Sequence, residues 1–160
     1  MIQQQIANIL VYDTKRNLVL TVVTMKISGK SPDWAALMRR NFYTDENATL
    51  PNAPFFLFAL ADHFYLWKNV DDKGEVKPTY DMDPRFALEP FFNKTGYSLK
   101  QLNRESFELV VGFCLSGIIL AYEKNDICSV DPRWLSEPNH EWLFGSGLFD
   151  AIKRGHIERL

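Results

Sequence analysis

Two apolar segments near the N-terminus, joined by five polar residues, constrain the fold more than any other feature of the chain. Residues 6–12 and 18–27 are rich in aliphatic and β-branched side chains, which favour strands. The connecting residues 13–17, DTKRN, have the polar character of a tight turn, so we expect an antiparallel hairpin. The second strand ends on Lys26, where a packed strand normally carries another apolar side chain.

The next segment predicts a helix followed by two more strands. A helix is expected over residues 32–43, because Ser31 is a good N-cap and Pro32 suits the first helical position. Two short apolar runs, residues 55–60 and 64–67, then indicate adjacent strands with a tight turn between them.

Helices dominate the remaining sequence. They are expected over residues 84–93, 98–123 and 146–154, with Ser98 as the N-cap of the long one. The resulting order is strand, strand, helix, strand, strand and then helices. This order predicts an α/β (α+β) fold in which a small mixed sheet is flanked by helices, with a helical C-terminal half.

Composition limits the classes of function that are open to the chain. The 160 residues suit one domain with one core, and 46% of them are apolar. The formal net charge of -2 provides no overall basic field. Contact with nucleic acid would therefore require a local cluster of lysine and arginine side chains.

Cysteine use and the apolar runs favour a cytoplasmic location. Cys114 and Cys128 do not have the spacing of metal ligands, and Cys114 lies in an apolar helical run where a buried reduced thiol is usual. The opening residues MIQQQ lack the basic start and apolar core of a secretory signal. The longest apolar run, residues 109–122, is too short to cross a bilayer, so no membrane partner is expected.

Five segments occur in the following order: VYDTKRNLVLTVVTMK, WAALMRRN, NAPFFLFALADHFYLWK, SFELVVGFCLS and SGLFDAIKRG. Together they resemble a group of small restriction-endonuclease-like proteins, frequent in cyanobacteria, within the PD-(D/E)xK nuclease superfamily. The resemblance covers nearly the whole chain from Ala7 onward. It implies one restriction-endonuclease-like domain over residues 1–160.

The resemblance also implies where an active site would lie. Members of the group have Pro-Asp before the first strand and Glu-x-Lys at the end of the second. Their carboxylates bind a divalent metal, and the lysine positions the attacking water and stabilises negative charge. Carried over, the Pro-Asp pair falls on Ala7 and Asn8, the Glu falls on Thr24, and the Lys falls on Lys26.

Only the lysine of this motif is present in the chain. Asn8 and Thr24 are uncharged, whereas hard divalent cations prefer anionic oxygen ligands, so metal binding should be severely weakened. No cofactor is expected, and Mg²⁺ or Mn²⁺ would be needed only if activity persists. The resemblance thus implies a degenerate nuclease-like protein, catalytically inactive, that acts as a DNA-binding or as an assembly or regulatory subunit.

Two alternatives stay open. The chain could be an active Mg²⁺-dependent DNA endonuclease that uses relocated carboxylates, of which Asp13 is the nearest on the hairpin. The ordinary role of an Asp at this position is to start the turn. The chain could instead be a structural interaction module with no role in nucleic-acid binding.

Three further cations are candidates for contact with phosphate. Arg39 and Arg40 lie near the end of the helix expected over residues 32–43, and Lys30 lies just before it. With Lys26 and Lys15 they would form a basic patch. The alternative for the two arginines is that they complement the negative end of the helix dipole.

The resemblance finally predicts a partner. Related proteins carry an N-terminal helix and a further strand before the hairpin, which we expect this chain to lack. The strand over residues 6–12 would then be an exposed edge, and exposed edges need to be covered or paired. A homodimer or a partner subunit bound through this strand is therefore expected.

Overall fold

The strands form one mixed sheet and a separate short pair. The described sheet has the order β7-β6-β5-β3-β2-β8, in which β3 and β5 run parallel and all other neighbours run antiparallel. Its strands are β2 (Ile9–Tyr12), β3 (Leu18–Met25), β5 (Phe55–Leu60), β6 (Phe64–Lys68), β7 (Tyr80–Met82) and β8 (His156–Arg159). The short pair consists of β1 (Gln4–Gln5) and β4 (Ala48–Thr49). This computed structural model describes residues 4–123 and 140–160.

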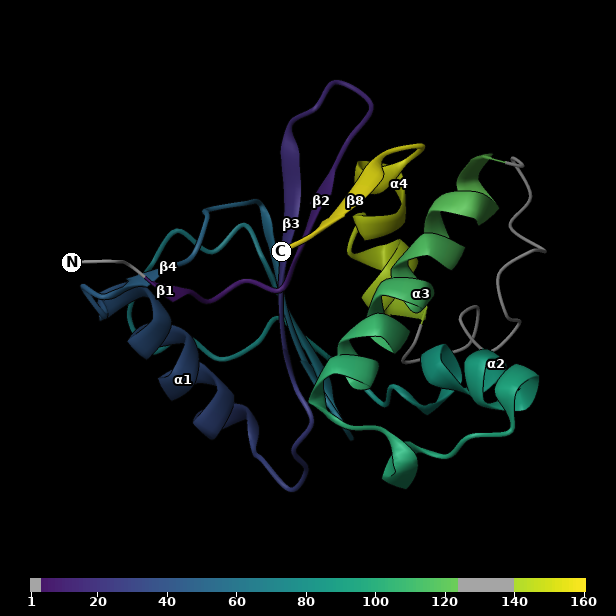
Figure 1. The fold of residues 1–160 in the computed structure, drawn as a ribbon. Coiled ribbons are helices and arrows are strands. Elements are labelled where there is room, and N and C mark those ends of the chain that lie inside the picture. The colour runs from purple at the N-terminus through teal and green to yellow at the C-terminus, as the bar shows by residue number, and fades with distance from the viewer. Residues whose placement is uncertain (1–3, 124–139) are drawn as a thin grey trace.

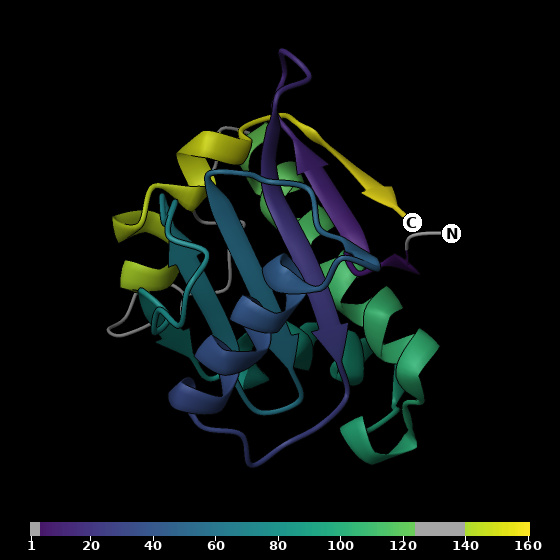
Figure 2. The same ribbon diagram turned by 90° about the vertical axis from the view of Figure 1, so that its left-hand side faces the viewer.

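Helices cover both faces of the sheet, which gives three layers (Figure 1). On one face lies α1 (Pro32–Thr44), and on the other lie α2 (Arg85–Thr95), α3 (Arg104–Glu123) and α4 (Leu148–Ile152) (Figures 1 and 2). A 3-10 turn, Leu99–Gln101, connects α2 to α3, and a π-helical turn, Glu141–Gly145, precedes α4. Because both faces are covered, every residue of β5 is buried, which explains its unbroken apolar sequence FFLFAL.

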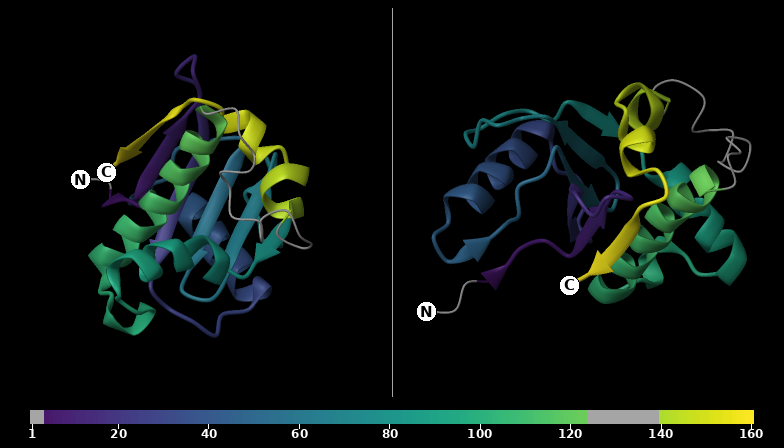
Figure 3. Two further views of the ribbon diagram at one scale, coloured as in Figure 1. Left: turned by 90° about the vertical axis from the view of Figure 1, so that its right-hand side faces the viewer. Right: turned by 90° about the horizontal axis from the view of Figure 1, so that it is seen from above.

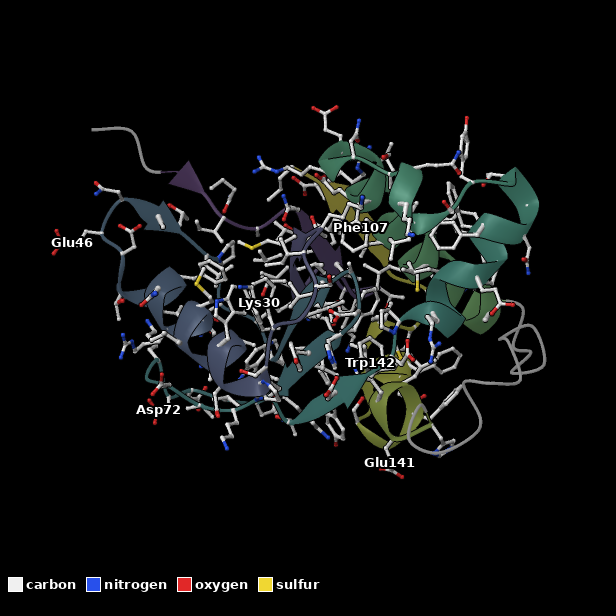
Figure 4. The ribbon with its side chains drawn as sticks, turned by 90° about the horizontal axis from the view of Figure 1, so that it is seen from below. Lys30, Glu46, Asp72, Phe107, Glu141 and Trp142 are labelled. Carbon is white, nitrogen blue, oxygen red and sulfur yellow. The ribbon has the colours of Figure 1, made fainter. Side chains whose placement is uncertain are left out.

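The alternation of side chains along β3 divides them between two hydrophobic cores. Val22 belongs to the core that includes Phe107 and Val111 of α3. Its neighbour Val23 belongs to the core on the other face, with Phe42 of α1. The side chains that close the first core come from the end of the chain, where Trp142 donates a hydrogen bond from its indole Nε1 to a carbonyl of β6 at 3.2 Å (Figure 4).

Local signals correctly predicted the β2–β3 hairpin and α1, but not the short β1–β4 pair. The turn between β2 and β3 forms because the Asp13 carboxylate accepts hydrogen bonds from the backbone N–H groups of Lys15 and Asn17, at 2.8 and 2.9 Å. The Oγ of Ser31 accepts a hydrogen bond from the N–H of Trp34 at 3.1 Å, so Ser31 caps α1 as expected. The mixed α/β fold class is also confirmed.

The long helix expected over residues 98–123 is interrupted. Its first part is the 3-10 turn, and α3 starts after two non-helical residues, Leu102 and Asn103. The Oδ1 of Asn103 accepts a hydrogen bond from the N–H of Ser106 at 2.8 Å, which is N-cap geometry. The prediction that Ser98 caps one continuous helix is therefore wrong.

The first strand of the hairpin is not the exposed edge that the sequence predicted. β8 pairs with β2 in antiparallel register, from Ile9 opposite Arg159 to Tyr12 opposite His156. The edge is thus covered within the same chain, which removes the argument for a homodimer or a partner subunit bound through residues 6–12. β8 is itself short, and exposed charged side chains on it discourage further strand pairing.

Helix α3 contains the longest apolar run and one of the two cysteines. No helix among the described residues is long and apolar enough to cross a membrane. The thiol of Cys114 is free, and burial raises its pKa to about 12, so it stays protonated at neutral pH. Cys128 lies outside the described residues.

Candidate functional site

The three motif positions carried over from the resemblance line one cavity. Its volume is about 530 Å³, and Asn8, Thr24 and Lys26 are among its lining residues. It lies where β3 ends, between the last part of α1 and the start of α3, from which Arg104 contributes. The fold therefore brings Asn8 and Lys26, which are 18 positions apart in the sequence, to one cavity.

Asn8 and Thr24 are joined directly by a hydrogen bond. The side-chain oxygen Oδ1 of Asn8 accepts from the backbone N–H of Thr24 at 2.7 Å, and the backbone N–H of Asn8 donates to the carbonyl of Val22 at 2.8 Å. Regular pairing of β2 with β3 ends at Ile9 opposite Val22, so the Asn8 side chain extends this pairing by one residue. The side chain of Thr24 is buried, and its residue is only 6% exposed.

Lys26 occupies a turn just beyond the end of β3. The backbone N–H of Ile27 donates to the carbonyl of Met25 at 2.9 Å, which closes a three-residue turn centred on Lys26. The turn takes the lysine out of the sheet, where it is partly exposed in the cavity. Its occurrence at the end of an apolar strand is explained, since the position no longer faces a core.

A second cation, Arg104, was missed by sequence reasoning. It is the first residue of α3, and it is exposed on the same cavity as Lys26. Among the described residues, neither side chain has an ion-pair or hydrogen-bond partner. The capping pattern of Asn103 and Ser106 in the sequence could have revealed the helix start and hence the exposure of Arg104.

The electrostatics of this cavity are positive. Lys26 and Arg104 are both cationic, and the N-terminus of α3 adds a partial positive charge, which Glu105 in its first turn opposes. Among the described residues that line the cavity, none is acidic. The described residues also hold no group of three His, Cys, Asp or Glu side chains that could bind a metal ion.

An adjoining cavity of about 350 Å³ is lined by an acidic residue. It shares Lys26 and Ile27 with the first cavity and adds Lys100 and Asp62. The Oδ2 of Asp62 accepts a hydrogen bond from the backbone N–H of Gly29 at 2.9 Å. One carboxylate that is already bonded to the chain does not make a metal site, because divalent cations need several oxygen ligands.

Asp13 does not join this group. It lies in the β2–β3 turn, before β3, whereas Lys26 follows the other end of that strand. Hydrogen bonds from the backbone N–H groups of Asn17 and, to a smaller extent, Lys15 hold the pKa of the Asp13 carboxyl below its usual value. The structure thus gives Asp13 the turn-forming role that was the alternative to a relocated carboxylate.

The three cations proposed as phosphate contacts are also placed elsewhere. Arg39 is only 2% exposed, and its guanidinium donates to the carbonyls of Val70 and Asp72 at 3.1 and 2.9 Å. Figure 4 shows Asp72 at the periphery beside α1, so Arg39 ties this loop to the helix. Burial also lowers the pKa of Arg39. Because the side chain is buried and bonded to the loop, the prediction that Arg39 contacts nucleic acid is wrong.

Lys30 and Arg40 are accessible but lie outside the cavity. The ammonium of Lys30 is 5.2 Å from the ring centroid of Trp34, at a distance typical of cation–π contacts. Arg40 is exposed on α1 and lies 3.5 Å from the Asn41 side-chain oxygen. Their role in nucleic-acid binding stays a prediction.

Comparisons with known proteins add no relative. No family model matches the chain, and neither a curated protein nor a solved structure matches it. The restriction-endonuclease-like resemblance is therefore not tested by them. The inference about function depends on the geometry of the cavity.

Proposed function

We propose that the chain is a degenerate PD-(D/E)xK nuclease-like protein that binds DNA through a backbone phosphate and does not hydrolyse it efficiently. The observation that carries the proposal is the cavity lined by Lys26 and Arg104, whose described lining residues include no acidic side chain. A phosphate group accepts hydrogen bonds from both kinds of cation, and arginine can bind it through two parallel bonds.

The uncharged side chains at the other two motif positions support binding without hydrolysis. Metal-assisted hydrolysis of a phosphodiester needs a divalent cation, which in turn needs anionic oxygen ligands. The Asn8 oxygen is occupied by the N–H of Thr24, and Thr24 offers only a buried hydroxyl. The meeting of these residues with Lys26 is what the resemblance implies, and it supports descent from a nuclease site.

Binding can be measured by fluorescence anisotropy with a labelled DNA oligonucleotide over a range of salt concentrations. Lys26→Gln and Arg104→Gln should each weaken binding, and each should reduce the slope of log affinity against log salt by about 1. Lys15→Gln is the matched control, because Lys15 lies in the turn at the opposite end of β3. Equal losses in all three variants would mean that the cavity has no special role.

Catalysis is tested by incubating the chain with plasmid DNA and Mg²⁺ or Mn²⁺. The natural chain should leave the plasmid intact, whereas the double variant Asn8→Asp with Thr24→Glu should cut it. Adding Lys26→Ala to the double variant should abolish the cutting again. Cleavage by the unmodified chain would favour the active endonuclease, and a lack of any DNA binding would favour the interaction module.

A further inference from the structure

A third cavity continues the line of the first two. Its volume is about 410 Å³, and it shares Ala61 and Leu99 with the second cavity, just as the second shares Lys26 and Ile27 with the first. The end of β3, the β5–β6 turn and the 3-10 turn all lie at one end of the sheet (Figures 2 and 3). The three cavities are therefore neighbours along this end of the sheet, and we call the surface that they line the sheet-end groove.

The two ends of the sheet-end groove differ in chemistry. Three cations, Lys26, Lys100 and Arg104, line its first and second cavities, and one acidic side chain, Asp62, also lines the second. The third cavity is lined mainly by apolar side chains such as Leu88 and Phe92, with the oppositely charged Arg85 and Glu89 also among its lining residues. A ligand that fits the whole groove must carry negative charge at one end and a flat or apolar group at the other.

Tyr97 lines the apolar end and is held there by a fixed backbone. It is 55% exposed, which is more than any other large apolar side chain among the described residues. Gly96 ends α2 with φ at 78°, a left-handed conformation that favours glycine, and its N–H donates to the carbonyl of Phe92 at 2.8 Å. This turn ends α2, and Tyr97 follows it as one of the residues that line the third cavity.

We infer that the sheet-end groove binds single-stranded DNA, with phosphates at Lys26, Lys100 and Arg104 and a base stacked on Tyr97 in the third cavity. The inference rests on the proposed function, which it extends from a phosphate contact to a class of DNA. A single strand exposes the faces of its bases to aromatic side chains. A duplex keeps its bases stacked and offers no group for the apolar end. Charge complementarity fixes the position of the backbone at the other end.

The inference is tested by anisotropy with three labelled ligands of equal length: oligo-dT, an abasic oligonucleotide and a duplex. Tyr97→Ala should weaken binding of oligo-dT roughly 5- to 150-fold, the range that stacking of one base on an aromatic ring provides. Tyr97→Phe should bind like the natural chain. Phe113→Ala is the matched control, because Phe113 is also an exposed aromatic residue but lies outside the groove on α3.

The abasic ligand separates stacking from a structural effect of the substitution. Tyr97→Ala and the natural chain should bind it equally, since it offers no base. If Tyr97→Ala leaves oligo-dT binding unchanged while Lys26→Gln weakens it, the single-strand inference is overturned and the proposed function stands. Duplex binding as tight as oligo-dT binding has the same meaning. If none of the three ligands binds, both proposals fail.

Discussion

The side-chain oxygen of Asn8 accepts a hydrogen bond from the backbone N–H of Thr24, at 2.7 Å. In a nuclease of the resembled kind these two positions would hold the two metal-binding carboxylates. In this chain the Asn8 side chain instead accepts the hydrogen bond of the Thr24 backbone N–H, at the point where β2 and β3 separate. This hydrogen bond holds the two strands together without requiring a charge on either side chain.

Replacing Asn8 should separate structure from charge. Asn8→Leu should lower the free energy of unfolding by roughly 1–3 kcal/mol, because it leaves the partly buried N–H of Thr24 without an acceptor. Asn8→Asp keeps an acceptor oxygen and should have a stability close to that of the natural chain. Urea unfolding monitored by circular dichroism provides both values. Equal stability of the two variants would mean that the hydrogen bond contributes little.

Gly155 should tolerate no side chain. A β-carbon at this position would overlap the backbone oxygen of Tyr12, so Gly155→Ala should push β8 away from β2 and cost more than about 2 kcal/mol. Hydrogen exchange should then increase at the amides of β2. Gly117→Ala is the control, because Gly117 lies exposed in α3 with no atom within 4 Å of the new carbon. That change should instead stabilise the protein by about 1 kcal/mol.

Arg39 should contribute to stability and not to DNA affinity. Its guanidinium donates to two loop carbonyls and lies 4.9 Å from the ring centroid of Tyr43. Arg39→Met should therefore cost about 2–3 kcal/mol in urea unfolding, while the exposed neighbour in Arg40→Met should change stability by less than about 0.5 kcal/mol. A loss of DNA affinity in Arg39→Met, measured under conditions where the variant is folded, would contradict this assignment.

Stability should fall at high pH because of Tyr65. Its hydroxyl donates to the carbonyl of Lys30 at 2.6 Å, and burial, followed by the charges of Asp81 and Asp62, raises its pKa to about 12. An unfolded tyrosine ionises near pH 10, so the unfolded chain loses the proton first. The contribution of Tyr65 to the free energy of unfolding is complete below pH 10 and is lost as the pH rises toward 12.

Urea unfolding at several values between pH 9 and 11.5 tests this expectation. Tyr65→Phe should have a shallower decrease in the free energy of unfolding than the natural chain. Some decrease should remain, because burial also raises the pKa of Tyr43. Identical slopes in the two proteins would show that Tyr65 titrates normally.

Elements with strong local signals could be predicted from the sequence. The hairpin has two apolar runs around a polar turn, and α1 has Ser31 as its cap and Pro32 next to it. β8 could not be predicted, because its sequence HIER contains one apolar residue. It is held by backbone pairing with β2, a partner from the other end of the chain. Such long-range pairing leaves no periodic pattern in a strand of four residues.

The candidate site was also only partly predictable from the sequence. Asn8, Thr24 and Lys26 line one cavity because β2 pairs with β3. The resemblance had indicated these three positions. Arg104 was missed because the expected long helix placed it in mid-helix. Arg39 was assigned to the surface because its burial is created by the loop that holds Asp72, which no local pattern indicates.

The pairing of β8 with β2 has a consequence for the order in which the chain can fold. Ile9 pairs with Arg159, so the sheet is closed only after residues 156–159 have been synthesised. Until then, the outer edge of a strongly apolar strand has free N–H and C=O groups, which can pair with another chain. We expect the interval before this closure to be the time at which nascent or truncated chains aggregate most readily.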